Sequence, residues 1–445
     1  MAEQGFALGE SRLEKNKRTQ VWRIKAPGDP RIREAGRILR EGGLVAFPTE
    51  TVYGLGANGL DGQACARIYA AKGRPSDNPL ILHVASLEEA KALAREWPEK
   101  AQRAANKLWP GPLTMIVPAA DCVPRQVTAG LDTVAIRFPA DAVAQALIEA
   151  AGVPVAAPSA NLSGRPSPTA AGHVLEDLGG RIDVILDGGP CKVGLESTII
   201  DLSVEPPALL RPGDITAETL AQILGPLEGM APSPAEQAEL SAAGPQLSKE
   251  GPPQPAKWAD LSAAGLQQPT GLVKPVDAPE PLGEPDRQTE SAAISAESGI
   301  KDGQAKGPKA PGMKYRHYAP KAPVTVLLGE PAAVAAYVLN RILPAQALEG
   351  EKSRTALLLC EETWRLLKQR ESGDGPFAGQ GWYCRDMGSR NRPREMAARL
   401  YDALRACDTE KARQIFVEGV NMAGQGAAVM NRLKKAAGNR LLLLD

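Results

Sequence analysis

A long stretch between Pro226 and Pro311 is dominated by Pro, Gly, Ala, Gln, Ser and Glu and shows no apolar periodicity. Such a segment cannot bury enough apolar surface to offset its conformational entropy, so we expect a mobile linker. An extended course along the first domain is the alternative. Because the chain has 445 residues, and a single core stops growing at roughly 250 to 300 residues, we expect a folded domain on each side.

The part before the linker alternates short apolar runs with helical patterns, which is typical of an α/β domain. The predicted strands are 44–47, 80–84, 113–117, 133–138, 153–156, 184–187 and 197–201. The predicted helices are 32–41, 63–71, 87–95, 99–108, 141–151, 170–178 and 217–224. Since Pro and Gly bound several runs in place of short hairpin turns, we expect a mixed sheet with substantial loops.

From Pro323 onward, the sequence again predicts alternating strands and helices. The predicted strands are 324–328, 355–360 and 414–418, with a candidate edge strand at 441–444, and the predicted helices are 332–342, 393–406 and 427–437. This order predicts a small parallel α/β domain of Rossmann-like type. The expected division is a flexible arm (1–20), a first domain (21–225), a linker (226–322) and a second domain (323–445).

Charge and cysteine usage exclude several classes of protein. Lys plus Arg equal Asp plus Glu, at 52 each, so no net field favours nucleic acid or an anionic membrane. The six cysteines form no Cys-x-x-Cys pair with histidine partners, which suggests neither a zinc site nor a disulfide framework. No secretory signal and no apolar run of roughly 20 residues is found. We therefore expect a soluble, cytoplasmic protein with reduced thiols.

The richest polar stretch is PTETVYGLG at 48–56, which follows an apolar strand. Open α/β folds place their ligands at such strand ends. Gly54, Gly56 and Gly59 also match the spacing of a dinucleotide-binding fingerprint. That fingerprint opens a helix directly from a strand, whereas here Pro48 and the polar residues interrupt the approach. We therefore interpret the glycines as a flexible turn and disfavour a nicotinamide cofactor.

Cations occur at other element ends. Lys72 and Arg74 flank a glycine at the end of a predicted helix, where they either complement the helix dipole or hold phosphate oxygens. Arg137 lies on a strand and needs a carboxylate or phosphate, from the protein or from a ligand. Together with Arg211, these cations favour one electropositive anion pocket. No Gly-x-x-x-x-Gly-Lys-Ser/Thr loop is present, so a Walker-type cradle is excluded.

Two further polar clusters, PSANLSG at 158–164 and EST at 196–198, lie at predicted strand ends. Their Ser and Asn side chains either contact a ligand or cap turns. Read in order, PTETVYGL at 48–55, KGRP at 72–75, NPL at 78–80, PSAN at 158–161 and EST resemble the YrdC-like family of threonylcarbamoyl-AMP synthases. GMKYRHYAP at 312–320 and GAAVMNR at 426–432 resemble its longer, two-domain form.

This resemblance covers nearly the whole chain except the N-terminal arm and the linker. It implies a YrdC-like twisted open sheet around a positive concavity, followed by the small Rossmann-like domain. It also implies a nucleotidyltransferase that condenses L-threonine, bicarbonate and ATP to threonylcarbamoyl-adenylate and pyrophosphate for tRNA modification. Mg²⁺ is implied to arrive with ATP. The implied partners are the machinery that transfers the product to tRNA and, as an open question, tRNA itself, with no membrane.

The resemblance also implies roles for individual residues. Lys72 and Arg74 are the implied catalytic cations, and no metal ligand of the protein is implied. The implied ATP site is Lys72, Arg74, Asn78, Thr133, Ser159, Asn161, Thr169, Arg211, Tyr315 and Tyr318. The implied threonine site is Thr51, His83, Arg137, Ser159 and Ser197. The implied lid over the phosphates is Tyr315, His317 and Tyr318.

Three alternatives stay open. Glu50 is either a base or a structural hydrogen-bond acceptor, and we favour the second because a carbamate nucleophile is already anionic. An RNA-binding module without ATP turnover would also use a basic concavity, although aromatic stacking platforms are scarce. A different carbamoyl-adenylating enzyme, of the hydrogenase-maturation type, would bring cysteine-rich zinc elements and an acylphosphatase-like segment that this sequence lacks.

Overall fold

The computed structural model describes residues 18–228, 318–349, 354–369, 377 and 381–444. The described residues belong to one compact unit. Most of the predicted arm and of the predicted linker lie outside the described residues, as do Tyr315 and His317. The predicted domain bounds stay a prediction.

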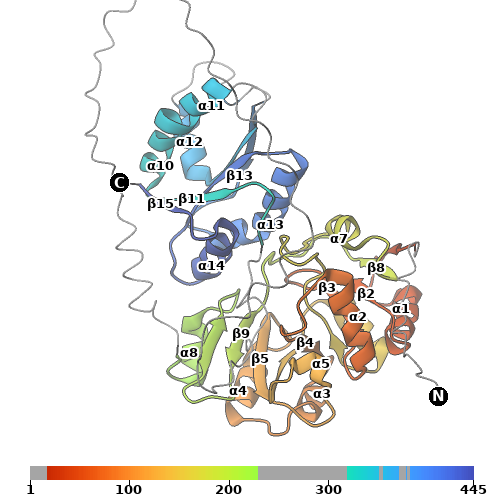
Figure 1. Cartoon of the computed structure of the whole chain (residues 1–445). Helices are drawn as coiled ribbons and strands as arrows, with labels where there is room; N and C mark the ends of the chain where they lie inside the picture. The colour runs from red at the N-terminus through yellow and green to blue at the C-terminus, as the bar shows by residue number, and fades with distance from the viewer. Residues whose placement is uncertain (1–17, 229–317, 350–353, 370–376, 378–380, 445) are drawn as a thin grey trace, which may run out of the picture. The chain divides into compact units, whose positions relative to one another are not determined.

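The first part of the described chain forms a mixed sheet of ten strands, in the order β1-β8-β2-β3-β7-β4-β6-β5-β9-β10 (Figure 1). The strands are β1 (Gln20–Arg23), β2 (Val45–Phe47), β3 (Gly54–Asn58), β4 (Ile81–His83), β5 (Leu113–Pro118), β6 (Thr133–Arg137), β7 (Val155–Ala156), β8 (Val184–Asp187), β9 (Thr198–Asp201) and β10 (Ala208–Arg211). Parallel pairs such as β4 with β6 alternate with antiparallel pairs such as β5 with β6. The predicted mixed α/β sheet is confirmed.

Helices cover both faces of this sheet. They are α1 (Pro30–Arg40), α2 (Gly62–Lys72), α3 (Leu87–Ala92), α4 (Glu99–Leu108), α5 (Arg125–Thr128), α6 (Ala142–Ala151), α7 (Ala171–Leu178) and α8 (Ala217–Leu224). Along β2, Val45 and Phe47 pack in the core beneath α1 and α6, whereas Ala46 packs in the core of the other face. This is the alternation expected of a strand buried on both sides.

The prediction of a flexible turn is wrong at Gly54 and Gly56, which lie in strand β3, antiparallel to β2, whereas Gly59 lies in the turn that follows this strand. A Cβ atom on Gly56 would lie 2.8 Å from a methyl carbon of Val155 and 3.0 Å from the ring of Phe47. The glycine therefore allows close packing of neighbouring strands. Strands β1 and β10 and the short helix α5 were also not predicted.

The later part forms a parallel sheet of five strands within the described residues, in the order β13-β12-β14-β11-β15. The strands are β11 (Val324–Leu328), β12 (Thr355–Leu359), β13 (Trp382–Asp386), β14 (Gln414–Glu418) and β15 (Leu441–Leu443). This confirms the predicted Rossmann-like arrangement with β15 at one edge. The sequence pattern does not predict strand β13.

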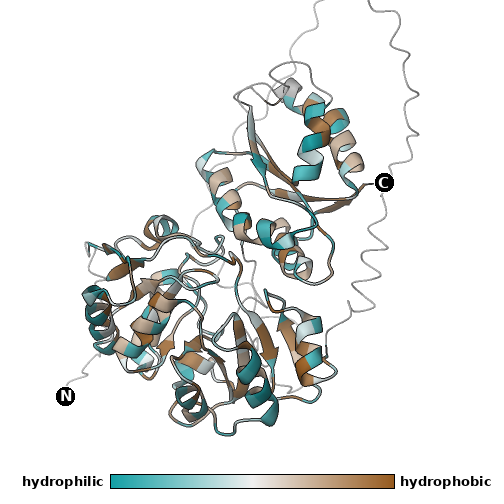
Figure 2. Cartoon of the chain, turned by 180° about the vertical axis from the view of Figure 1, so that it is seen from behind, coloured by the Kyte–Doolittle hydropathy of each residue, from teal (hydrophilic) through white to brown (hydrophobic). Residues whose placement is uncertain are grey.

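Helices again lie on both faces of the second sheet. One face carries α10 (Pro331–Tyr337), a π-helical turn (Val338–Ile342), α11 (Leu343–Glu349) and α12 (Glu361–Gln369), and the other carries α13 (Pro393–Thr409) and α14 (Gly426–Ala437). Helix α12 was not predicted. Figure 2 shows that the strands are mostly hydrophobic, whereas the helices carry both hydrophobic and hydrophilic residues.

None of the helices in the described part of the chain combines the length and hydropathy needed to cross a bilayer. All six cysteines, which fall within the described residues, are free thiols.

Candidate active site

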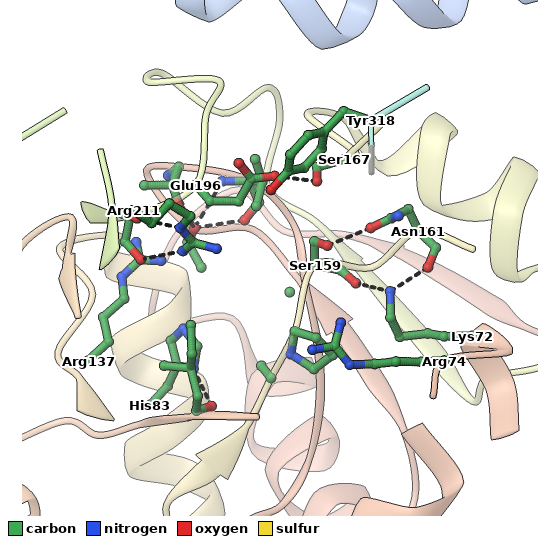
Figure 3. Close-up of a pocket in the computed structure, with 18 of the residues that line it drawn as sticks. Lys72, Arg74, His83, Arg137, Ser159, Asn161, Ser167, Glu196, Arg211 and Tyr318 are labelled. Atoms are coloured by element: carbon green, nitrogen blue, oxygen red, sulfur yellow. Dashed lines mark hydrogen bonds between the residues drawn. The ribbon is translucent and has the colours of Figure 1, made fainter. Parts of the chain in front are cut away.

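Polar and charged side chains from distant parts of the first sheet meet around one hollow of about 700 Å³, including its open mouth (Figure 3). Its polar and charged lining residues are Thr49, Thr51, Lys72, Arg74, His83, Arg137, Ser159, Asn161, Ser163, Ser167, Glu196, Ser197, Arg211 and Tyr318. Most of them follow or end a strand or helix of the first domain. The predicted convergence of the sequence motifs is therefore observed.

Lys72 lies at the end of α2, where Gly73 adopts a left-handed conformation (φ 59°) and stops the helix. Its ammonium group donates to the main-chain carbonyl oxygens of Ser159 and Asn161. Burial, together with the charge of Arg74, lowers the pKa of Lys72. Lys72 thus ties the end of α2 to the loop that follows β7.

The Ser159 hydroxyl donates to the side-chain oxygen of Asn161 over 2.5 Å. The Asn161 amide group in turn donates to the carbonyl oxygens of Leu162 and Arg165. Arg74, just beyond Lys72, donates to the carbonyl of Pro79 over 3.1 Å, and burial lowers its pKa to about 10, so it stays charged at neutral pH. In Figure 3 these four residues lie on one side of the hollow.

Arg137 and His83 lie on the other side, on the neighbouring strands β6 and β4, where they are register partners. The Arg137 guanidinium donates to the Glu50 carboxylate over 2.7 Å, and Arg137 is 4% exposed. Its buried Nε has no hydrogen-bond partner among the described residues. Glu50 also accepts from the main-chain N–H of Ala140. Arg137 therefore has a protein carboxylate as partner, and Glu50 makes the structural contact that we favoured.

His83 makes the stability of the fold sensitive to acid. Burial and the charge of Arg137 lower the pKa of His83 to about 3 from its usual 6.5. Below about pH 6.5 the unfolded chain takes up this proton and the folded protein does not, so stability falls as the pH drops towards 3, with a slope approaching ~1.4 kcal/mol per pH unit. In urea titrations from about pH 7 to 5, we expect His83→Gln to lose less stability than the wild type. Parallel losses would contradict this prediction.

Arg211, at the end of β10, forms the third part of the wall. Its guanidinium donates to the Ser197 carbonyl over 2.9 Å and to the Ser197 hydroxyl over 3.1 Å. That hydroxyl also pairs with Thr114 over 2.7 Å. Tyr318 borders the same hollow and is 5% exposed. Arg211, implied for ATP, and Ser197, implied for threonine, are thus hydrogen-bonded neighbours.

Some implied ligand residues do not line this hollow. Asn78, Thr133 and Thr169 are described but lie outside the lining. The Asn78 side chain is buried, and neither of its amide atoms has a partner among the described residues. Conversely, Ser167 lines the hollow although no sequence motif indicated it. Glu196 belongs to the EST motif, but a role for its carboxylate was not predicted.

The fold and the pocket define a class: an α/β protein whose cations and hydroxyls gather around a site suited to an anionic ligand. A family model described as "Telomere recombination" (Sua5, YciO and YrdC) matches residues 37–213. A second model, "Threonylcarbamoyl-AMP synthase, C-terminal domain", matches residues 285–438.

Full-length relatives agree with both models. The threonylcarbamoyl-AMP synthase of Pyrococcus abyssi is 40% identical over 413 residues, which cover 93% of this chain and 95% of the relative. That of Bacillus subtilis is 38% identical over 415 residues, with the same coverage. The crystal structure of P. abyssi Sua5 complexed with L-threonine is 37% identical, covers 96% of this chain and 99% of its own, and superposes with a TM-score of 0.69. The chain belongs to the threonylcarbamoyl-AMP synthases, a family of nucleotidyltransferase enzymes.

Proposed function

We propose that this chain condenses L-threonine, bicarbonate and ATP into threonylcarbamoyl-adenylate and pyrophosphate for the modification of tRNA. The observation that carries the proposal is the meeting of Lys72, Arg74 and Arg137 around one hollow. Cations that share a low-dielectric site hold a triphosphate and an amino-acid carboxylate more strongly than cations in water. Membership of the family favours this activity over RNA binding alone and over hydrogenase maturation.

We assign the two substrates to two sets of residues that adjoin each other, since Arg211 of the ATP set hydrogen-bonds to Ser197 of the threonine set. The proposed ATP site comprises the catalytic Lys72 and Arg74 with Asn78, Thr133, Ser159, Asn161, Thr169, Arg211, Tyr315 and Tyr318. The proposed threonine site comprises Thr51, His83, Arg137, Ser159 and Ser197. Because Ser159 belongs to both sets, the reacting groups of the two substrates would meet beside it.

The chemistry needs little covalent help from the protein. The threonine amine combines with bicarbonate, with loss of water, or with carbon dioxide, with loss of a proton, to give a carbamate. The carbamate carboxylate then attacks the α-phosphorus while pyrophosphate leaves. Lys72 and Arg74 would position the phosphates and balance their charge, and a neutral His83 would leave the carbamate without a competing proton donor. The product is a mixed anhydride, so a lid of Tyr315, His317 and Tyr318 would slow its hydrolysis.

A divalent metal fits this arrangement if it arrives with ATP. Within the described residues, no group of three or more His, Cys, Asp or Glu side chains could hold a metal ion. Mg²⁺ usually keeps several waters and binds through substrate phosphates, where it would shield their charge. We propose that the adenylate passes in the cytoplasm to the machinery that transfers it to tRNA.

A pyrophosphate-release assay tests the proposed function. The protein is incubated with ATP, Mg²⁺ and bicarbonate, and each amino acid is supplied in turn. We expect release that requires threonine and bicarbonate together, because the carbamate must form before it can attack the nucleotide. Release in the absence of either, or equal release with every amino acid, would contradict the substrate assignment.

A further inference from the structure

A buried carboxylate lies in the wall of the proposed ATP site. Glu196 is 6% exposed and, among the described lining residues, is the only acidic side chain. Burial by itself would raise the pKa of Glu196, but the charges of Arg432 and Arg211 outweigh it and hold the pKa at about 2. Glu196 therefore carries a full negative charge at neutral pH, in a site proposed to receive a triphosphate.

The groups that hold this carboxylate come mainly from the second sheet's helices. Arg432 of α14 donates from Nε to Glu196 Oε2 over 3.0 Å, and Tyr401 of α13 donates to the same oxygen over 2.9 Å. Ser167, from the first domain, donates to Glu196 Oε1. Thus the cation that hydrogen-bonds to this carboxylate comes from outside the first sheet.

Arg432 is also fixed in place by other contacts. It is 0% exposed, and its Nη1 donates to the Pro212 carbonyl over 2.6 Å. Its guanidinium carbon lies 5.8 Å from the centroid of the Tyr318 ring, which stacks on Tyr401 at 5.3 Å. A buried cation that contacts both an aromatic ring and a carboxylate is strongly held, and Arg432 makes both contacts.

The loss of Arg432 would affect the neighbouring cation, Arg211. Arg211 lines the hollow and interacts electrostatically with Glu196, although its hydrogen bonds go to Ser197. Without Arg432, the buried Glu196 carboxylate would lose the cation that hydrogen-bonds to it, and Arg211 and Lys435 would be left to balance its charge. Arg211 would then be less available to an anionic ligand, and Glu196 would repel that ligand directly.

We propose that Arg432 is a positioning residue for the ATP site: it neutralises Glu196 and so leaves the charge of Arg211 free for the triphosphate. This inference rests on the proposed function and extends it, because it makes a helix of the second sheet part of the nucleotide site. Arg432 itself does not line the hollow. It acts through Glu196.

The test measures ATP binding directly by calorimetry, with the full-length chain and without turnover. We expect Arg432→Met to weaken ATP binding by about 30-fold, while threonine binding changes by less than about threefold, because threonine is neutral overall. In the double variant Glu196→Gln/Arg432→Met, which removes both charges with similar volumes, we expect ATP binding to return to within about fivefold of wild type.

Arg394→Ala is the matched control. Arg394 lies on α13, on the same face of the second sheet as α14, and pairs with Asp214 of the first domain, but it is largely exposed and does not line the hollow. We expect its ATP affinity to equal that of the wild type. A double variant as weak as Arg432→Met would show that Arg432 only supports the structure, and would overturn the proposal. Unchanged ATP binding in Arg432→Met would overturn it as well.

Two further results keep this inference separate from the proposed function. If Arg432→Met does not fold, the comparison moves to Arg432→Lys and the double variant, both expected to bind ATP within about fivefold of wild type. Loss of binding in either folded variant overturns the inference. A wild type that binds no ATP would instead contradict the proposed function itself.

Discussion

Arg74→Ala is expected to lower kcat/KM for ATP by about a thousandfold while leaving the fold intact. A cation in a water-poor site stabilises the negative charge of the phosphates in the transition state. Losing one such group lowers the rate roughly 10²- to 10³-fold. Among the described residues, the Arg74 guanidinium donates its hydrogen bonds to the main-chain carbonyls of Asn78 and Pro79. We therefore expect the melting temperature to change by about 2 °C or less. Initial rates and a thermal melt measure both quantities.

Arg67→Ala is the control for this variant. Arg67 lies on the same helix α2, but its side chain is exposed. Its removal is expected to change neither the rate nor the melting temperature measurably. Turnover by Arg74→Ala within about threefold of wild type would remove Arg74 from the catalytic site.

Arg137→Met is expected to raise KM for threonine by about 100-fold, with a much smaller effect on KM for ATP. We assign the guanidinium of Arg137 to the threonine carboxylate, and a bidentate pair of this kind accounts for such a loss. The substitution also leaves the Glu50 carboxylate, 11% exposed, without its ion-pair partner. Breaking a buried pair in this way costs about 3 to 5 kcal/mol, so the melting temperature should fall as well.

The double variant Glu50→Gln/Arg137→Met separates these two effects. With the carboxylate neutralised, the fold should recover most of its lost stability, whereas KM for threonine should stay high. Recovery of threonine affinity together with stability would mean that Arg137 supports the pocket without binding the substrate. Steady-state kinetics at saturating ATP and a thermal melt give both answers.

Much of the fold could be predicted because apolar periodicity survives in the sequence. The strand Val184–Asp187 and the helix Glu99–Leu108 were predicted with their observed bounds. Strand β3 was not, since its glycines imitate a turn and their role depends on how closely β2 and β7 approach. Strand β13, at the edge of its sheet, begins with the half-buried Trp382 and Tyr383 and has no fully buried residue, so it lacks the apolar run of a central strand.

The gathering of Lys72, Ser159 and Asn161 could be anticipated from motifs, because each motif ends an element of an α/β sheet. The Arg137 partner could not, since the pattern left a protein carboxylate and a ligand equally open. The link between Glu196 and Arg432 joins residues 236 positions apart. No local pattern marks such a pair, so only the tertiary structure reveals it.

The most direct test of the central claim is a crystal structure of this protein with a non-hydrolysable ATP analogue and L-threonine bound together. The account predicts the triphosphate beside Lys72, Arg74 and Asn161, with the threonine carboxylate on Arg137. Nucleotide bound elsewhere on the molecule, with this hollow empty of both ligands, would contradict it.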